Sequence, residues 1–402
     1  MTIDSKHNRP PLGSRTRQVH LGRDRGLSHG FVNVPPFRGS TVLFPNVAAL
    51  ERQDQRFTYG THDTPTTEML REAWTDLSGA AGTVLVPSGL AAIVVALQAA
   101  VSAGDHLLVV DTAYTPTRIY CERTLKRFGV ETTYYDPALG AEVAALFRHN
   151  TKAIVVESPG SQSMEVQDVP AIAAEAAKRG ICVILDNTWA TPLNFMPHAH
   201  GVDICIEAGT KYLGGHSDIL LGLVTANKRW FKRLHASTDI MGVQPGSEEV
   251  FLALRGLRTM ELRLREAERQ AMAMARWFRQ RDEVARVLYP ALPDCPGHDI
   301  WKRDFTGASG LFSVVLKPAS KEAVAAMLDG LELFGIGWSW GGYESLVIPF
   351  DCAPYRTATT WAPGGPTLRF SIGLEDIADL QDDLARGFER LSGAQKFSRP
   401  SA

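Results

Sequence analysis

The chain has 402 residues, of which 45% are hydrophobic and 21% charged, and this is the composition of an ordinary globular protein. Its 42 lysines and arginines nearly balance its 44 aspartates and glutamates, and the formal net charge is −2. No bulk positive charge is present to hold nucleic acid or an anionic membrane surface. The length predicts about two to three domains. We therefore expect a small-molecule partner, with neither nucleic acid nor a membrane.

The start of the chain and the cysteines indicate the cellular setting. The first twenty residues are polar and basic, which predicts no secretory signal, and residues 1–12 are expected to be flexible. No run of about 18 apolar residues predicts a membrane span. His198 and His200 have no third candidate ligand nearby, so no metal site is predicted. The five cysteines are scattered and odd in number, which is typical of reduced thiols in a cytoplasmic protein. They are Cys121, Cys182, Cys205, Cys295 and Cys352.

The first part of the chain predicts an arm that leads into regular structure. Prolines interrupt residues 13–58, and we expect an arm with little regular structure. An apolar arm needs another surface to lie on, and a neighbouring subunit is one candidate. From residue 64, TPTTEMLREAWTDLSG predicts a helix with a threonine cap and a glycine stop. GTVLV then predicts a strand, followed by a turn at residues 87–89 and a long apolar helix.

The middle of the chain alternates apolar strands with helices. Helices are predicted over 115–129 and 170–180. Continuous apolar strands of this kind indicate a buried, mostly parallel sheet with helices on both faces, whose ligands bind at the carboxyl ends of the strands. The predicted strands are 105–111, 130–136, 152–158, 181–187, 203–209 and 219–226.

The last third of the chain has a different order of elements. Residues 248–288 predict one or two long helices, and the four arginines within 255–265 are expected to form a solvated, salt-bridged face. From about residue 308, a strand (GLFSVVLK), a helix (KEAVAAMLDGL) and a closing helix (LEDIADLQDDLARGFERL) follow. They predict a smaller α+β domain.

Lys211 and Asp186 are the strongest chemical candidates. Lys211 follows an apolar strand within AGTKYLGGHSD. A semi-buried lysine has a lowered pKa and becomes the neutral nucleophile of Schiff-base chemistry, although a surface loop lysine is the ordinary alternative. Asp186 closes the strand ICVILD, where a buried carboxylate needs a partner such as the protonated ring nitrogen of pyridoxal phosphate (PLP); the alternative is a turn cap.

Weaker candidates add the remaining contacts of a PLP site. The helix that begins at Gly89 and Leu90 offers free amides to a phosphate, or is an ordinary helix start, and Thr210 can add a hydroxyl. Tyr114 follows a strand and can stack on a flat ring, or pack in the core. Arg369, in TLRFSIGLED, binds a carboxylate through two hydrogen bonds if it faces inward, and is otherwise exposed.

These residues and several longer motifs resemble the Cys/Met-metabolism family of PLP enzymes, the γ-family of fold type I. The resemblance covers about residues 13–392 and includes VLVPSGLAA, DTAYTPTR, DNTWATP, GTKYLGGHSDIL and RFSIGLED. ESPGSQSMEVQDVP, WKRDFTGASGLFS and SWGGYESL are similar to the bacterial cystathionine β-lyase branch of the family. The resemblance implies an α/β, PLP-dependent transferase-like fold, with a large, mostly parallel seven-stranded sheet domain and a smaller C-terminal α+β domain. The expected parts are an arm (1–59) on a neighbouring subunit, a PLP-binding domain (60–257) and a C-terminal domain (258–402).

The resemblance also implies roles for the candidate residues. Lys211 would form the Schiff base with PLP and move protons, Asp186 would pair with the ring nitrogen, and Tyr114 would stack on the ring and act in catalysis. The amides of Gly89 and Leu90, with Thr210, would hold the phosphate. The substrate carboxylate would bind Arg369, with help from Ser339, Trp340 and Tyr114. Tyr59 would reach the cofactor of a neighbouring subunit, which implies a homodimer or homotetramer.

The chain departs from the family where the family usually has Tyr-x-Arg. Here Tyr59 is followed by Gly60, Thr61 and His62. Either Thr61 or His62 replaces the arginine that holds the phosphate across the subunit interface, or PLP binds more weakly. Trp338 stands where γ-acting relatives tend to have glutamate, and an aromatic residue there favours β-elimination.

The implied activity is PLP-dependent cleavage of the Cβ–S bond of L-cystathionine to homocysteine, pyruvate and ammonia, a step of methionine biosynthesis. Side activity on cystine and cysteine S-conjugates is expected. A γ-acting sibling (cystathionine γ-lyase, γ-synthase or methionine γ-lyase) is the alternative. The chain lacks G-x-G-x-x-G and G-x-S-x-G, which disfavours a dehydrogenase and an α/β-hydrolase.

Overall fold

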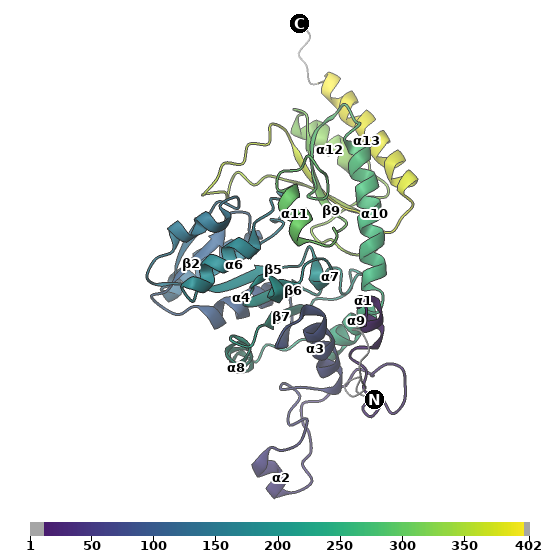
Figure 1. Cartoon of the computed structure of the whole chain (residues 1–402). Coiled ribbons are helices and arrows are strands. Elements are labelled where there is room, and N and C mark those ends of the chain that lie inside the picture. The colour runs from purple at the N-terminus through teal and green to yellow at the C-terminus, as the bar shows by residue number, and fades with distance from the viewer. Residues whose placement is uncertain (1–11, 398–402) are drawn as a thin grey trace.

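The computed structural model describes residues 12–397 and shows two sheets with their helices. In Figure 1 a long segment near the N-terminus, which carries α2, extends away from the body of the molecule. Within the described residues no helix is both long and apolar enough to cross a bilayer. The predicted flexibility of residues 1–12 falls on a segment that, apart from Leu12, lies outside the described residues.

Two short helices lie in the segment that was expected to have little regular structure. They are α1 (Ser14–His20) and α2 (Val47–Arg52). The side chain of Asn46 caps α2 by accepting a hydrogen bond from the Ala49 N–H. The prolines of this segment outweighed that capping residue in the sequence-based prediction. The arm exposes apolar side chains, including Leu43, which is 86% exposed.

The first long helix, α3 (Pro65–Ser78), begins and ends where the sequence predicts. Thr64 caps it by accepting a hydrogen bond from the Thr67 N–H, and Gly79 ends it in the left-handed conformation at φ 64°. Its apolar face packs against α9 (Ser247–Leu257) and β1 (Gly82–Val86). These contacts attach α3 to the edge of the large sheet that β1 forms.

The large sheet has seven strands in the order β1-β7-β6-β5-β4-β2-β3. All pairs are parallel except those of β7, which runs antiparallel to β1 and β6, so the prediction of a mostly parallel sheet is confirmed. The carboxyl ends of the parallel strands therefore meet at one edge. The remaining strands are β2 (His106–Val110), β3 (Glu131–Tyr135), β4 (Thr151–Glu157), β5 (Cys182–Asp186), β6 (Ile204–Ala208) and β7 (Gly222–Ala226).

The helices between these strands pack on the sheet. Contacts join α4 to β6 and β7, α6 to β5, and α8 to β1. The helix predicted over 115–129 is α-helical only at its start and continues as a π-helical and a 3₁₀ turn. All five cysteines are buried as free thiols. The helices are α4 (Gly89–Ala100), α5 (Thr115–Tyr120), α6 (Val169–Lys178), α7 (Thr191–Asn194) and α8 (Phe231–Met241).

The C-terminal part forms a five-stranded sheet in the order β10-β11-β12-β9-β8. The helix α10 (Met260–Phe278) ends before β8 (Val284–Leu288) begins. The helical prediction for residues 248–288 is therefore wrong for the residues that form β8. Figure 1 shows α10, α12 and α13 together around this sheet. The domain boundaries near residues 59 and 257 stay predictions. The other elements are α11 (His298–Asp304), β9 (Leu311–Leu316), α12 (Lys321–Asp329), β10 (Gly335–Ile336), β11 (Leu346–Phe350), β12 (Thr367–Ser371) and α13 (Ile377–Phe397).

Two of the four arginines predicted on a solvated helix face are instead only partly exposed and donate to backbone carbonyls. Arg258 donates to two carbonyls of the segment that follows α1, and Arg263 donates to the carbonyl of Tyr212 at 2.7 Å. Burial lowers the pKa of both side chains to about 10. The prediction is wrong here because loop carbonyls without a backbone partner need donors, and a guanidinium offers several in one plane. Arg263 thereby fixes the loop that carries Lys211.

Candidate active site

A cavity of about 750 Å³ lies at the carboxyl edge of the large sheet, between it and the smaller sheet. The chain order explains this: β4, β5 and β6 are parallel neighbours, so the residues that end them face the same space. The structure brings most predicted site residues together there, while their roles stay predictions. The predicted residues that line the cavity are Gly89, Leu90, Tyr114, Asp186, Thr210, Lys211, Trp340 and Arg369.

Lys211 projects into the cavity from the loop after β6. Its Nζ donates to Ser339 Oγ at 2.8 Å and lies 5.2 Å from the centre of the Trp340 ring. Burial, with the charge of Arg369 second, lowers the pKa of Lys211 to about 8, and the charge of Asp186 opposes this shift. With this pKa roughly a tenth of the amine is neutral at pH 7, and the neutral form is the one that can attack an aldehyde.

Asp186 ends β5 and is held by Thr188. Its Oδ1 accepts from the Thr188 N–H at 3.1 Å and from Thr188 Oγ1 at 2.6 Å. Thr188 Oγ1 in turn accepts from the Ala208 N–H at 3.0 Å, which directs the hydroxyl hydrogen toward Asp186. Burial raises the pKa of Asp186, because the ionised form has little solvent. A cation facing the carboxylate from the cavity would stabilise the charge.

Two further buried acids lie beside Asp186 and were missed in the sequence. Glu157 ends β4 opposite Asp186 and accepts from the Tyr114 N–H at 2.7 Å, and Glu207 on β6 accepts from Asn187 Nδ2 at 3.0 Å. Burial, with the charge of Asp186 second, raises the pKa of both well above the usual range. The same signal that singles out Asp186, an acid at the end of an apolar strand, marks Glu157.

The start of α4 forms an anion cradle. The Ala91 N–H donates to Ser88 Oγ at 3.1 Å, and the Ala92 N–H donates to the Ser88 carbonyl at 3.0 Å, which leaves the Gly89 and Leu90 amides without partners inside the helix. A Cβ on Gly89 would lie 2.8 Å from the Ala208 Cβ, so only glycine allows this close approach. The dipoles of a 12-residue helix favour a negative group at this end.

Thr210 and Tyr114 also line the cavity, and they differ in their contacts and exposure. Thr210 Oγ1 accepts from the Leu221 N–H at 3.1 Å, so its hydroxyl is bonded to the residue that precedes β7. Tyr114 is half-exposed above the sheet edge, with its backbone anchored by Glu157. Burial raises the pKa of Tyr114, which keeps the phenol protonated at neutral pH.

Arg369, on β12, closes the cavity from the second sheet. Its Nη2 donates to the carbonyls of Trp338 at 2.8 Å and Ser339 at 3.2 Å. Its Nε is buried and has no partner among the described residues. Burial lowers the pKa of Arg369 to about 10. A buried, unsatisfied N–H on a guanidinium is costly, and a carboxylate bound in the cavity would satisfy it.

Tyr59 is the one predicted site residue that stands apart. It is 45% exposed, pairs with Thr41 in an isolated bridge and does not line the cavity of its own chain. Thr61 is exposed, and His62 Nδ1 lies 3.1 Å from Thr58 Oγ1. The contact of Tyr59 with a second subunit's cofactor stays a prediction.

The residues around the cavity fit PLP. An amine with a lowered pKa, a buried acid and an unsatisfied helix N-terminus match the aldehyde, the ring nitrogen and the phosphate of that cofactor. The fold and this set of groups together define a PLP-dependent enzyme of fold type I.

Comparison with known proteins gives the family. Residues 15–389 match the family described as Cys/Met metabolism PLP-dependent enzymes, and the chain belongs to it. A Rhizobium johnstonii protein provisionally named cystathionine β-lyase is 51% identical over 94% of this chain and 97% of its own length. The Escherichia coli cystathionine β-lyase MetC is 40% identical over 94% and 98%. The structure of Xanthomonas oryzae cystathionine γ-synthase in complex with cystathionine is 30% identical, with a TM-score of 0.87 over 96% and 100% of the two chains.

Proposed function

We propose that the enzyme cleaves the Cβ–S bond of L-cystathionine to give homocysteine, pyruvate and ammonia, with side activity on cystine and cysteine S-conjugates. The observation that carries the proposal is that one cavity holds both the Lys211 amine and a guanidinium N–H of Arg369 that has no partner within residues 12–397. The higher identity to β-lyases, 51% and 40% against 30% for the γ-synthase structure, supports β-elimination.

Binding and proton removal are assigned to three side chains. PLP, when bound, withdraws electrons from Cα of the amino acid joined to it. Arg369 binds the α-carboxylate and fixes the direction of the Cα–H bond. Lys211, neutral in part because its pKa is about 8, takes the proton from Cα, and Ser339 Oγ at 2.8 Å from Nζ holds the amine in place.

The acids at the carboxyl edge of the large sheet hold protons where the reaction needs them. Asp186 would hold the ring nitrogen of PLP in its protonated form, while Glu157 stays neutral because burial raises its pKa well above the usual range. The protonated phenol of Tyr114 donates a hydrogen bond to the departing sulfur. The 2-aminoacrylate that leaves hydrolyses in solution to pyruvate and ammonia.

The γ-acting alternative requires a second proton removal, at Cβ, and gives other products. Trp338 lines the cavity and offers no acid or base for that step. Purified PLP-loaded enzyme and L-cystathionine, with pyruvate read through lactate dehydrogenase, test the proposal. Pyruvate with homocysteine is expected; 2-oxobutyrate with cysteine would show γ-elimination. Racemised amino acid without pyruvate would show that Lys211 moves the Cα proton without elimination.

We also propose that the enzyme acts in the cytoplasm as a homodimer or homotetramer. The exposed apolar side chains of the arm support association, since Phe31, Val32 and Leu43 are each more than half exposed. The position of Tyr59 supports the same proposal because this side chain does not line the described cavity of its own chain. Sedimentation of the PLP-loaded protein tests this, and a monomer with full activity would contradict it.

A further inference from the structure

The outer wall of the cavity, which we define as the part lined by Asp351 and Tyr355 of the loop after β11, holds one charged side chain that the proposed reaction does not use. The charged residues that line the cavity are Glu157, Asp186, Lys211, Arg369 and Asp351. The first four surround the reacting centre. Asp351 follows β11, is exposed and has no ion-pair partner among residues 12–397. Its Oδ1 accepts from the Ala353 N–H at 2.9 Å, which leaves the other carboxylate oxygen available to a ligand.

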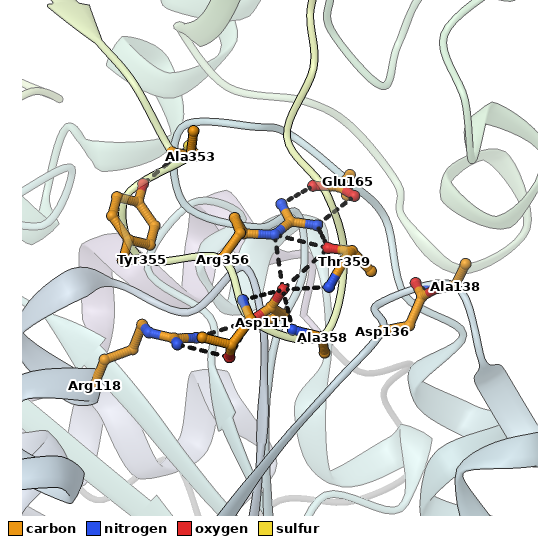
Figure 2. Close-up of polar contacts among 12 residues, drawn as sticks. Asp111, Arg118, Asp136, Ala138, Glu165, Ala353, Tyr355, Arg356, Ala358 and Thr359 are labelled. Carbon is orange, nitrogen blue, oxygen red and sulfur yellow. Dashed lines mark hydrogen bonds and ion pairs between the residues drawn. The ribbon is translucent and has the colours of Figure 1, made fainter.

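The loop that carries Asp351 is fastened to the large sheet by a buried charge cluster, shown in Figure 2. Asp111, directly after β2, accepts from the backbone N–H groups of residues 357–359 at 2.9–3.2 Å. It also accepts from Arg118 Nη1 at 2.9 Å and Arg356 Nε at 3.0 Å, and Arg356 Nη1 reaches Glu165 at 2.7 Å. Arg118 and Arg356 are each 3% exposed, and Asp111 is fully buried.

The Asp111 carboxyl in this cluster favours its ionised form although it is fully buried. Burial opposes ionisation of Asp111, but hydrogen bonds from the loop backbone outweigh burial and hold the pKa of Asp111 below its usual range. A charged carboxylate that gathers three successive backbone N–H groups fixes the path of that backbone. The loop therefore has one position relative to the sheet edge, and so do the two side chains it presents to the cavity, Asp351 and Tyr355.

We propose that Asp351 binds the ammonium group at the far end of the thioether substrate, and that the Asp111 cluster positions the loop 351–359 that carries it. This inference rests on the proposed function. Arg369 binds the α-carboxylate and Lys211 takes the proton from Cα, both next to the Cβ–S bond, so the other half of the substrate extends toward the outer wall. Among the described residues of this chain, the charge on that wall is negative, so the cavity recognises the far ammonium and leaves the far carboxylate to solvent.

Two analogues of cystathionine separate these groups. S-(3-aminopropyl)-L-cysteine keeps the far ammonium, and S-(3-carboxypropyl)-L-cysteine keeps the far carboxylate. We expect kcat/KM for the aminopropyl compound to be higher by about tenfold, the factor for 1.4 kcal/mol from one charge-assisted contact near solvent. Asp351→Asn retains an acceptor for the Ala353 N–H but loses the charge, and should make the two analogues nearly equal. S-methyl-L-cysteine, which has no far end, serves as the reference substrate.

A matched pair of substitutions tests the positioning role of the cluster. Thr359 Oγ1 donates to Asp111 Oδ2 at 3.0 Å and accepts from Arg356 Nε at 2.9 Å, whereas Thr360 is exposed and outside the cluster. Thr359→Val should raise KM for the aminopropyl compound and reduce its preference, with kcat for S-methyl-L-cysteine retained. Thr360→Val should change neither quantity. These variants avoid Asp111→Asn, which would leave two buried arginines short of a partner and could prevent folding.

The change in cofactor absorbance on mixing the PLP-loaded enzyme with each analogue, read before product accumulates, gives a measure of binding that is separate from pyruvate formation. An unchanged preference in Asp351→Asn, or a wild-type preference for the carboxypropyl compound, would overturn the assignment of Asp351. Equal effects of Thr359→Val and Thr360→Val would overturn the role of the cluster. A binding preference as predicted, without pyruvate from any substrate, would contradict the proposed function and leave this inference standing.

Discussion

Replacing Lys211 with methionine should stabilise the PLP-free protein. Burial lowers the pKa of Lys211 from 10.5 to about 8, so the folded chain holds an ammonium in an unfavourable place. That difference corresponds to about 3 kcal/mol, at roughly 1.36 kcal/mol for each pH unit. Methionine has a similar length and no charge. Near pH 7 we expect the free energy of unfolding of Lys211→Met to exceed that of the wild type by about 3 kcal/mol.

The pH dependence of that gap separates the charge from other effects of the substitution. Below about pH 8 the folded and unfolded wild type both carry the proton, so the cost is fully present. Between about pH 8 and 10.5 the folded state releases the proton while the unfolded state keeps it, and the wild type gains stability relative to the variant. Urea unfolding of both PLP-free proteins, at one protein concentration, measures this. A gap that stays constant from pH 7 to 10.5 would refute the reasoning.

Three further substitutions test the site. Lys211→Ala should abolish both pyruvate formation and the absorbance of lysine-linked PLP, and a variant that retains both would contradict the assignment of the lysine. Asp186→Asn should bind PLP yet lower kcat by about 10²-fold or more, because an amide cannot hold a proton on the ring nitrogen; unchanged steady-state kcat would argue for a turn cap instead. Arg369→Lys should raise KM about tenfold, because an ammonium cannot form the paired contacts of a guanidinium, and inhibition by simple carboxylic acids should weaken in parallel.

The sequence was sufficient to predict the sheet and the centre of the site. Apolar strands that alternate with helices allow one main architecture, and that architecture collects the strand ends at one edge. Asp186 and the loop with Lys211 could be placed there because Asp186 ends an apolar strand and the loop follows another. The sequence left open whether Arg369 faces inward or is exposed, and the structure shows it buried at the cavity.

Long-range contacts could not be predicted in the same way. Asp111 and Arg356 are 245 positions apart, and no local pattern indicates that the loop of the second sheet folds onto the end of β2. Arg263 was assigned to solvent because helix charges usually are solvated, whereas here it donates to the loop after Lys211. The role of Tyr59 depends on a second copy of the chain, which neither the sequence nor one subunit contains.

The most direct test of the central claim is the product pair formed from L-cystathionine by the PLP-loaded wild-type enzyme. The reaction can be followed by NMR, which reports both the oxo acid and the thiol in a single sample. The arrangement of Lys211, Asp186 and Arg369 predicts equal amounts of pyruvate and homocysteine. Formation of 2-oxobutyrate and cysteine, or unchanged cystathionine beside a fully loaded cofactor, would contradict β-elimination at this site.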